Sequence, residues 1–327
     1  MTPLPPPGHA PRLRFRTLHQ RDLAECMTLL PPHLGLSAGQ LAALPALWQR
    51  LAREPSIISG VMEDSTLPAD QRIQAWGVTM ALRQTVVAAL ALDTAPRAYL
   101  VRRVYEGLLD RSIEPMTDRE IGIDNARGEL VLMVLHFSMR SSDLGDPYVH
   151  KVVAVANDTF RVFHDGYQLR ALYYENSAAA ELVALSSGFD VRRLVDAEQL
   201  QGLAPEVRPA LYALTREDAR RRVPGAPARN SFEHQPPRFR FNASQRRLLW
   251  NALFEDRDGA LLPLLDVSTH GLKKLWRGIY ERIEDVSPDF FGDTAAEDDG
   301  KRGPEKRRQV MGYVRQRPEE LRPWTST

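Results

Sequence analysis

Apolar and polar positions follow two different patterns along the chain, and the pattern changes near residue 197. Before that point, short apolar runs alternate with segments of helical spacing, which predicts alternating strands and helices. The clearest strand spans 129–139 (ELVLMVLHFSM), a nearly continuous apolar run typical of a strand buried on both faces. Further strands are predicted at 13–17, 56–62, 73–82, 167–174 and 189–194.

Start and stop signals predict helices between these strands. Asp146 and Pro147 open a helix over 148–164, with the aspartate as N-cap and the proline at the first helical position. Asn176 is expected to cap a second helix that ends before Gly188. Helices are also expected over 21–30 and 96–109. This order of elements predicts a mixed α/β domain over residues 12–196.

The composition changes after this domain. Residues 197–236 contain a short helix and then a Pro-, Ala- and Arg-rich stretch without periodicity, which predicts an interdomain linker. From residue 237 the apolar positions recur only at helical spacing, so 237–327 is predicted to be a second, all-α domain with a basic C-terminal tail. Residues 1–11 are rich in proline and are predicted to be a disordered leader.

The helix predicted after Ser268 has two chemically different faces. At 100° per residue, one narrow sector of this helix is apolar and consists of Leu272, Trp276, Ile279 and Ile283. The opposite, basic face consists of Thr269, His270, Lys273, Lys274 and Arg277. A capped helix from Asp258 and a short turn precede it, so the segment has the form of a helix-turn-helix that reads the major groove of DNA.

Each residue of this basic face has an expected role. Thr269, His270, Lys273 and Lys274 are expected to reach base edges and nearby phosphates. Arg277 is expected on a phosphate, and Ser268 is expected to cap the helix and bring its N-terminus near the DNA backbone. The alternative is a solvated charged face on an ordinary packing helix.

The turn and the basic helix also resemble a known motif. The matching residues are Leu265, Val267, Ser268, Leu272, Lys273, Trp276 and Ile279. They resemble the LuxR-type helix-turn-helix, in which an LGVS turn precedes a V-K-x-x-W/H-x-x-I helix. Asp266 stands where that family has glycine, and aspartate is among the residues that best tolerate a left-handed backbone. Pro263 interrupts the preceding helix.

Composition narrows the class of protein. The net charge is +1, but basic residues cluster in the C-terminal part, and a DNA-binding protein needs only one basic surface. The single cysteine, Cys26, excludes an intramolecular disulfide and a multi-cysteine zinc site. No apolar run approaches the length of a membrane span. These observations predict a cytoplasmic protein, and the Arg-, Ala-, Leu- and Pro-rich composition suggests a GC-rich bacterial genome.

The α/β part resembles a second family. The order of strands and helices over 129–194 resembles the back half of the GNAT-type N-acetyltransferase fold, and NSAAAELVALSSGF is similar to that family's N…A…GF segment. The opening, LRFRTLHQRDLAECMTLL, resembles the start of that family. The resemblance implies an acetyltransferase-like mixed sheet over residues 12–196.

In the GNAT-type family, a Q/R-x-x-G-x-G/A loop binds the pyrophosphate of acetyl-CoA through backbone N–H groups. In the corresponding window, Arg140 and Gly145 match, but Asp143 stands where the first glycine belongs. Its carboxylate would repel the pyrophosphate, and Asp146 would occupy amides that a phosphate needs. We therefore predict no catalytic residues and no cofactor, with acetyl-CoA disfavoured.

The candidate ligand-binding residues of this half are His136, Arg140, Gly145 and Tyr174. Alternation along the strand would let His136 point into a cleft, whereas a hydrogen-bonded core histidine is the alternative. Tyr174 lies at a strand end where acetyltransferases place active groups, and packing explains it equally well. The eight histidines show no metal-ligand spacing, so no metal site is expected.

Both halves together predict a sequence-specific DNA-binding transcriptional regulator. We expect a nucleoid-associated homodimer that binds double-stranded DNA, responds to a small-molecule effector and has no membrane partner. Its α/β domain would sense a ligand or dimerise without catalysis. One alternative is an active acetyl-CoA-dependent N-acetyltransferase with an appended nucleic-acid- or protein-binding domain. Another is an interaction protein whose helix-turn-helix serves assembly.

Overall fold

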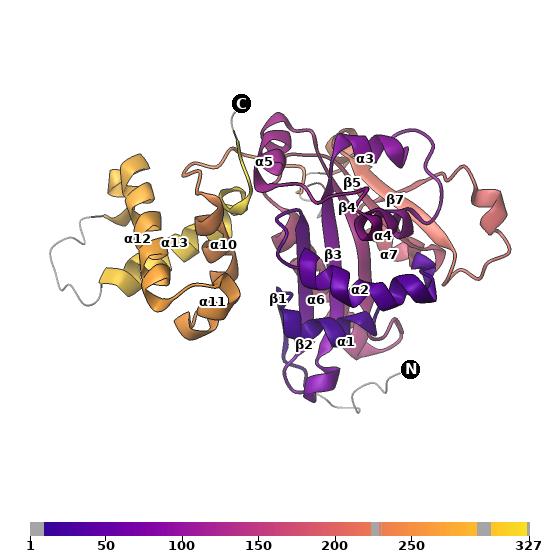
Figure 1. Ribbon diagram of the computed structural model, residues 1–327, viewed down its shortest axis with the longest axis horizontal. Coiled ribbons are helices and arrows are strands. Elements are labelled where there is room, and N and C mark those ends of the chain that lie inside the picture. The colour runs from indigo at the N-terminus through magenta and orange to yellow at the C-terminus, as the bar shows by residue number, and fades with distance from the viewer. Residues whose placement is uncertain (1–9, 224–228, 230, 293–301, 326–327) are drawn as a thin grey trace.

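Seven strands form one mixed sheet in the N-terminal part of the chain (Figure 1). They are β1 (Leu13–Thr17), β2 (Ile57–Asp64), β3 (Ile73–Leu82), β4 (Leu130–Met139), β5 (Leu169–Ser177), β6 (Asp190–Arg192) and β7 (Pro209–Thr215). Their order across the sheet is β1-β2-β3-β4-β5-β7-β6. Only β4 and β5 pair in parallel, and every other neighbouring pair is antiparallel. The predicted mixed α/β class of this part is confirmed.

The fold comes from a computed structural model that describes residues 10–223, 229, 231–292 and 302–325. Residues 1–9 of the predicted leader lie outside this part of the chain. Among the described residues, no helix combines the length and the apolar character needed to cross a lipid bilayer.

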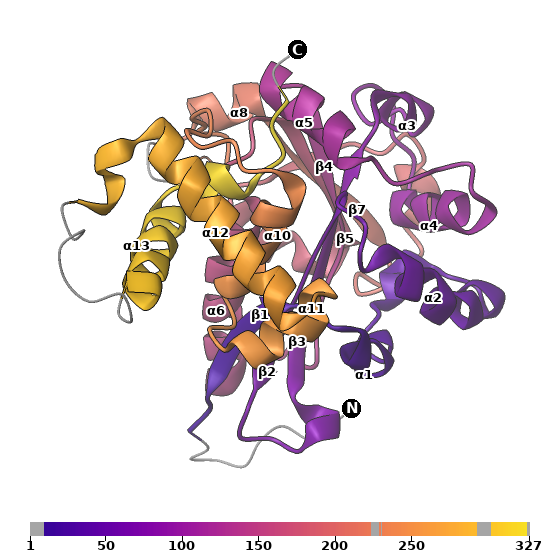
Figure 2. The ribbon, with the colours of Figure 1, turned by 60° about the vertical axis from the view of Figure 1, so that its left-hand side comes forward.

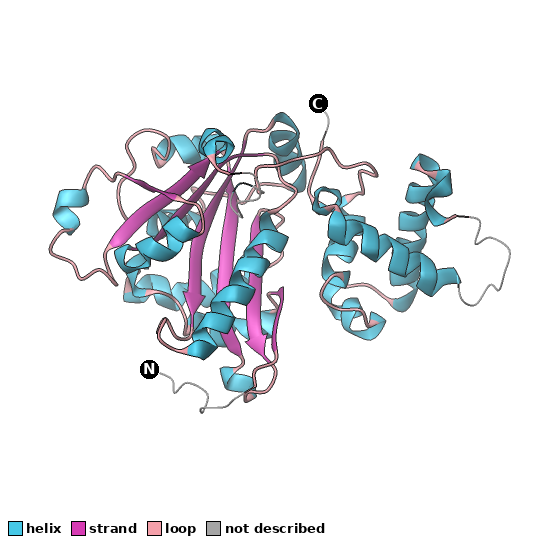
Figure 3. Ribbon diagram, turned by 180° about the vertical axis from the view of Figure 1, so that it is seen from behind, coloured by secondary structure: helices cyan, strands magenta, loops and turns pink. Residues whose placement is uncertain are grey.

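Helices cover both faces of the sheet (Figures 1 and 3). One face carries α1 (Leu23–Met27), α2 (Ala38–Leu51) and α4 (Leu100–Asp110), and the other carries α6 (Pro147–His164) and α7 (Glu181–Ser186). The remaining helices of this unit are α3 (Gln84–Ala89), α5 (Asp118–Arg127) and α8 (Arg216–Arg221). Short 3-10 turns occur at Gln20–Asp22, Pro32–Leu34, Ala69–Gln71, Ala178–Ala180 and Ala197–Leu200.

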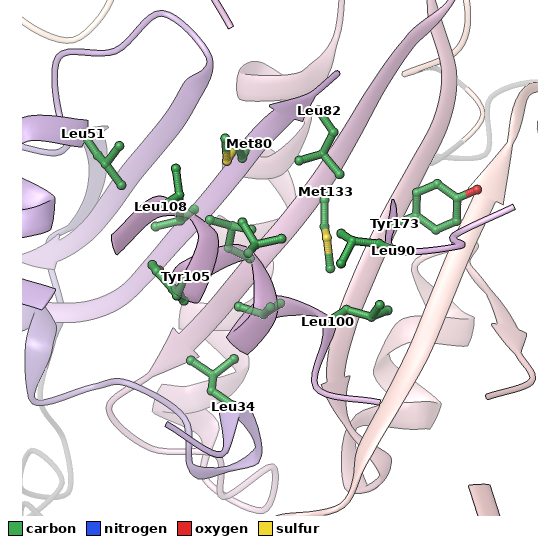
Figure 4. Packing of buried hydrophobic residues seen from close by; sticks show 14 of the residues in the cluster. Leu34, Leu51, Met80, Leu82, Leu90, Leu100, Tyr105, Leu108, Met133 and Tyr173 are labelled. Atoms are coloured by element: carbon green, nitrogen blue, oxygen red, sulfur yellow. The ribbon is translucent and has the colours of Figure 1, made fainter. Parts of the chain in front are cut away.

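The central strand β4 is buried on both faces, as its apolar run predicts. Val131, Met133 and Leu135 face the core under α2 and α4, whereas Leu132 and Val134 face the opposite core. Figure 4 shows the first of these cores, where Met133 lies near Leu82 of β3, Leu90 after α3 and Leu100 of α4. Two fully buried aromatic rings, Trp48 and Trp76, pack edge to face in the same core at 5.2 Å between centroids.

The predicted linker is partly wrong, because part of it belongs to the sheet. Pro209–Thr215 forms β7, which inserts between β5 and β6 and pairs with both. Arg216–Arg221 continues as α8, with Thr215 as its capping residue. Consequently the predicted final strand, β6, is an edge strand and not the last strand of the chain.

Other local predictions are confirmed or corrected. Asp146 caps α6 by accepting a hydrogen bond from the backbone N–H of Tyr148, 2.7 Å, and Pro147 takes the first helical position as predicted. The predicted cap at Asn176 is wrong, because this residue lies inside β5 and the helical turn begins after Ser177. Gly188 ends that helix with a positive φ of 97°.

In the C-terminal part, the regular elements among the described residues are all helical. They are α10 (Ala243–Ala252), α11 (Asp258–Leu265), α12 (Thr269–Val286) and α13 (Arg302–Gln316), with short 3-10 turns at Pro288–Phe291 and Pro318–Leu321. Their apolar sides meet in a separate core that includes Phe239, Leu249, Leu265, Trp276 and Val310. Figure 2 shows α12 crossing in front of α10, on the side of this helical unit that faces away from the sheet.

The two units meet beside β1 and α6. Phe163 of α6 packs against the rings of Trp250 and Phe254, at 4.8 and 5.6 Å between centroids. Arg322, which follows the last 3-10 turn, donates hydrogen bonds to the carbonyl oxygens of Val162 (2.7 Å) and Asp165 (2.9 Å). The C-terminal segment therefore satisfies carbonyl groups at the end of α6, where a helix has no partners of its own.

Candidate functional site

A cavity of about 320 Å³ lies between the sheet and helices α6 and α7. Its walls are mainly apolar and include Met62, Val134, Phe137, Phe160, Phe163 and Phe189. A pocket of this size and lining accommodates a small, largely apolar molecule. The polar groups at its wall include Thr79 and His164, and these two already bind each other, with 2.8 Å between Oγ1 and Nε2.

The cavity exists because β4 and β5 separate. Their parallel pairing ends at Val134 and Tyr174, although β4 continues to Met139 and β5 to Ser177. At the same point β4 carries an extra residue, Leu135, between the partners of Val78 and Thr79 on β3. Such a bulge bends a strand and changes the face to which the following side chains point.

This bulge corrects the expectation for His136. Strict alternation from Val134 would turn His136 toward the cavity, but the bulge turns it to the opposite face and places Phe137 at the cavity wall. His136 is fully buried against Trp76, 4.4 Å between ring centroids. Burial, together with the nearby charge of His33, lowers the pKa of His136 to about 3, so the ring is neutral.

The other three predicted ligand-binding residues do not come together. Tyr174 lines the cavity, and its hydroxyl accepts a hydrogen bond from the Asn176 side chain. Arg140 turns toward α1, where its guanidinium pairs with Glu25 and donates to the carbonyl oxygen of Ile73 at 3.0 Å. Gly145 lies in the loop that follows β4. The structure therefore brings only Tyr174 to the cavity.

The loop between β4 and α6 binds its own carboxylates. The backbone N–H of Gly145 donates to Asp143 Oδ1 at 2.9 Å, and that of Tyr148 donates to Asp146 Oδ1 at 2.7 Å. The N–H of Asp146 donates to the carbonyl oxygen of Asp143, 3.1 Å. No residue from 140 to 146 has a positive φ, so the loop lacks the alternating conformation of an anion-binding nest.

A buried polar cluster lies on the opposite side of β4 and β5. Glu175 is fully buried and accepts hydrogen bonds from the backbone N–H groups of Leu100 (2.9 Å) and Val101 (2.8 Å) at the start of α4. Burial raises the pKa of Glu175 to about 7 against the opposing effect of these two donors. Because the carboxylate caps α4, packing and capping account for its position.

The basic face predicted on α12 is present and exposed. Ser268 caps the helix by accepting a hydrogen bond from the N–H of Gly271 at 3.1 Å. Leu272, Trp276, Ile279 and Ile283 are buried in the helical core. The exposed residues on the other side are Thr269, His270, Lys273, Lys274 and Arg277. The predicted division of this helix into an apolar and a basic face is confirmed.

The cations on α12 are weakly neutralised. Arg277 lies 3.5 Å from Glu281, but both side chains are more than 60% exposed, and such a pair contributes little in water. Lys273 and Lys274 have no ion pair among the described residues. In contrast, Lys306 and Arg307 of α13 pair with Glu284 and Asp258, both at 2.6 Å. The basic face of α12 therefore keeps its positive charge, whereas these two cations of α13 are neutralised.

The turn before α12 has the backbone that its sequence suggested. Asp266 adopts a left-handed conformation, with φ 58° and ψ 50°. Arg247 of α10 donates a hydrogen bond to the carbonyl oxygen of Leu264 at 2.8 Å, so α10 supports the end of α11. Pro263 lies inside α11 without ending it.

Sequence reasoning missed several residues that line cavities. Phe137 reaches the apolar cavity only because of the bulge, and a bulge has no signal in a single apolar run. His164 lies at the end of the helix predicted over 148–164, where its Nδ1 is 2.7 Å from the carbonyl oxygen of Phe160. Within the described residues, no group of three or more His, Cys, Asp or Glu side chains is arranged to hold a metal ion.

Comparisons with known proteins give fold-level similarities only. No family model and no curated protein sequence matches the chain.

Among solved structures, a mutant of SpeG spermidine N-acetyltransferase from Vibrio cholerae has a TM-score of 0.35 and 12% identity, over 62% of this chain and 94% of that one. An agmatine N-acetyltransferase mutant without ligand has a TM-score of 0.31 and 14% identity, over 62% of this chain and 99% of that one. The NatC complex bound to Gag peptide and CoA has a TM-score of 0.34 and 11% identity, over 62% of this chain and 98% of that one. Scores this low establish no family for the chain.

Proposed function

We propose that this protein is a sequence-specific DNA-binding transcriptional regulator. The observation that carries the proposal is the exposed basic face of α12, held on a helical core beside a capped turn. Thr269 and His270 occupy its first turn, where a recognition helix presents side chains to base edges. Lys273, Lys274 and Arg277 follow on the same face and would neutralise phosphates.

The shape of the helical unit supports a helix-turn-helix of the LuxR type. In this proposal α11, the turn at 266–268 and α12 are the DNA-binding elements, and α10 and α13 supply the supporting core. Proteins with this motif commonly bind two-fold related half-sites, so we propose a homodimer. Such a regulator acts in the bacterial cytoplasm, associated with the nucleoid.

The α/β unit is proposed to have an acetyltransferase-like fold that binds an effector without catalysis. Two features support this: the apolar cavity where β4 and β5 separate, and the loop amides taken up by Asp143 and Asp146. A cofactor pyrophosphate would have to displace both carboxylates and would meet their negative charge. A small apolar effector faces neither obstacle.

The dependence of DNA affinity on salt tests the role of α12. Each neutralised phosphate adds about 0.9 to the slope of log affinity against log salt, so Lys274→Ala with Arg277→Ala should lower the slope by up to about 2. Lys151→Ala with Arg193→Ala removes the same charge from exposed positions on α6 and after β6, and should leave the slope unchanged. An unchanged slope in the α12 variant would remove this helix from the interface.

The second candidate is an active acetyl-CoA-dependent N-acetyltransferase with an appended binding domain. One observation favours it: beyond Val134 the edge of β4 that faces β5 has no strand partner, although β4 stays paired with β3 on its other edge. This free edge borders the cavity, where it would offer backbone groups to an extended ligand. Calorimetric titration of the full chain with acetyl-CoA tests it. Saturable binding in the micromolar range, together with acetylation of an amine substrate, would replace an effector role of the α/β unit with catalysis.

A further inference from the structure

A second cleft, of about 540 Å³, lies between the α/β unit and the helical unit. One wall comes from the end of β1, the end of α2 and the start of β2, and the other from α10 and α11. A molecule in this cleft would touch both units at once. Its size is within the range of pockets that hold small organic ligands.

Four arginines line this cleft, and one of them is already neutralised by a carboxylate. Arg246 of α10 places Nη2 at 2.5 and 2.6 Å from the two carboxylate oxygens of Asp118 on α5. This contact joins the two units. Arg322 is buried and donates to the carbonyl oxygens of Val162 and Asp165. This leaves Arg53 and Arg247, one from each unit, as the cations of the cleft that remain for a ligand.

No described carboxylate pairs with either of these two arginines. Arg53 is exposed and forms no hydrogen bond or ion pair with any described residue. Arg247 uses one donor on the carbonyl oxygen of Leu264, and a guanidinium has five. Burial lowers the pKa of Arg247, and the charge of Arg53 lowers it further, so the two cations repel each other.

The only other carboxylate that lines the cleft is Glu54, and no ion pair joins it to either arginine among the described residues. Asp266 is close enough to Arg247 to favour its charged form. The local excess is therefore positive and is shared between the two units. A bound anion would relieve the repulsion and gain charge-assisted hydrogen bonds from both sides.

We propose that this cleft is an effector site for a small organic anion, whose phosphate or carboxylate group bridges Arg53 and Arg247. The walls around the arginines, which include Pro55, Trp250 and Leu264, would hold the less polar part of the molecule. This cleft adjoins the apolar cavity under α6 and α7, with which it shares Ile58 and Phe163 in its wall. It has no residue in common with the basic face of α12.

The position of Arg247 links this site to DNA binding. It contacts Leu264 at the end of α11, directly before the left-handed residue Asp266 and the capped start of α12. An anion that draws Arg247 toward Arg53 would shift or break the hydrogen bond from Arg247 to Leu264. The turn before α12 would then lose this contact with α10. Only this coupling rests on the proposed DNA-binding function, because anion binding itself does not require it.

Anion binding to the full-length protein tests the site. Inorganic pyrophosphate and citrate serve as the phosphate and carboxylate ligands in calorimetric titrations at low, constant ionic strength. Because Arg53 is exposed and forms no hydrogen bond or ion pair within the described part of the chain, Arg53→Gln should fold normally. It should weaken binding of these anions about tenfold through loss of one charge-assisted partner. Arg193→Gln is the matched control, an exposed arginine that follows the edge strand β6. It should bind as the wild type does.

The outcomes separate this inference from the proposed function. Saturable binding that Arg53→Gln weakens and Arg193→Gln does not would support the site, even if the protein bound no DNA. No saturable binding of either anion, or equal binding by both variants, would overturn it. DNA phosphate is the other source of the same chemistry. If Arg53→Gln weakened DNA binding in the absence of added anion and neither anion bound, the small-molecule site would be wrong.

Discussion

Arg246 and Asp118 form an ion pair that connects the two units, with Nη2 at 2.5 and 2.6 Å from the carboxylate oxygens. The arginine side chain is 10% exposed, whereas the aspartate is 39% exposed. A nearly buried guanidinium that loses its partner stays charged, because arginine does not deprotonate in proteins. The pair therefore holds the units together in a way that exposed ion pairs do not.

Asp118→Asn should destabilise the protein measurably. We expect the free energy of unfolding to fall by about 1–2 kcal/mol, because the amide cannot compensate the charge of Arg246. Chemical denaturation followed by tryptophan fluorescence measures this change. Glu217→Gln is the control, since it breaks a pair with Arg221 in which both side chains are more than two-thirds exposed, and it should cost less than about 0.5 kcal/mol. Equal losses in the two variants would contradict this account of the interface.

His164 should remain neutral well below the usual pH of histidine ionisation. Burial and, to a smaller degree, the charge of Arg322 lower its pKa from 6.5 to about 4, against the raising effect of the hydrogen bond to the Phe160 carbonyl. The unfolded chain therefore takes up this proton near pH 6.5 and the folded chain only near pH 4. The stability that the neutral ring contributes is fully present above pH 6.5 and is lost as the pH falls toward 4.

Carbon chemical shifts of the His164 ring, assigned by their absence in His164→Gln, report this ionisation directly. If the protein stays folded at this pH, the expected midpoint of the titration lies near pH 4. If the protein unfolds first, the ring should keep the chemical shift of a neutral histidine until unfolding begins. A midpoint near 6.5 in the folded protein would mean that the His164 ring is not buried in solution.

Asp266 should tolerate glycine better than any residue with a β-branched side chain. Its φ of 58° is left-handed, and glycine adopts this conformation without a steric cost. We expect Asp266→Gly to leave stability unchanged or raise it, and Asp266→Val to lower it by about 1–2 kcal/mol. Urea denaturation of both variants measures the difference. If valine and glycine gave the same stability, the turn would have another backbone in solution.

Thr269 and His270 should influence which sequence is bound more than how tightly DNA is bound. Both lie in the first turn of α12, where side chains reach base edges, and each good base contact is worth about 1–3 kcal/mol of discrimination. Thr269→Ala or His270→Ala should therefore reduce the ratio of specific to random duplex affinity and leave random binding nearly unchanged. A parallel loss on both duplexes would indicate phosphate contacts only.

The elements with strong local signals were the ones that the sequence could predict. The aspartate–proline start of α6 fixes its first turn, and the apolar run of β4 allows little but a buried strand. On α12 the four buried residues recur at helical spacing, so that the two faces follow from geometry alone. These predictions needed no information about distant parts of the chain.

The missed elements depend on long-range contacts or contain a misleading residue. β7 begins with Pro209 and lies in a segment rich in proline and arginine, and only pairing with β5 and β6 makes it a strand. α2 contains Pro45 and still forms, because Leu44, Leu47 and Trp48 bury their side chains against the sheet. The orientation of His136 depends on one extra residue in β4, and the interdomain cleft depends on how two units pack. Neither has a local pattern.

The most direct measurement of the central proposal is selection of genomic fragments by the purified full-length protein, followed by sequencing. We expect the wild-type protein to enrich a motif with two-fold symmetry and half-sites about one helical turn apart. The double variant Lys274→Ala with Arg277→Ala should not enrich this motif. Failure of the wild-type protein to retain any fragment at low salt, with and without added pyrophosphate or citrate, would contradict it.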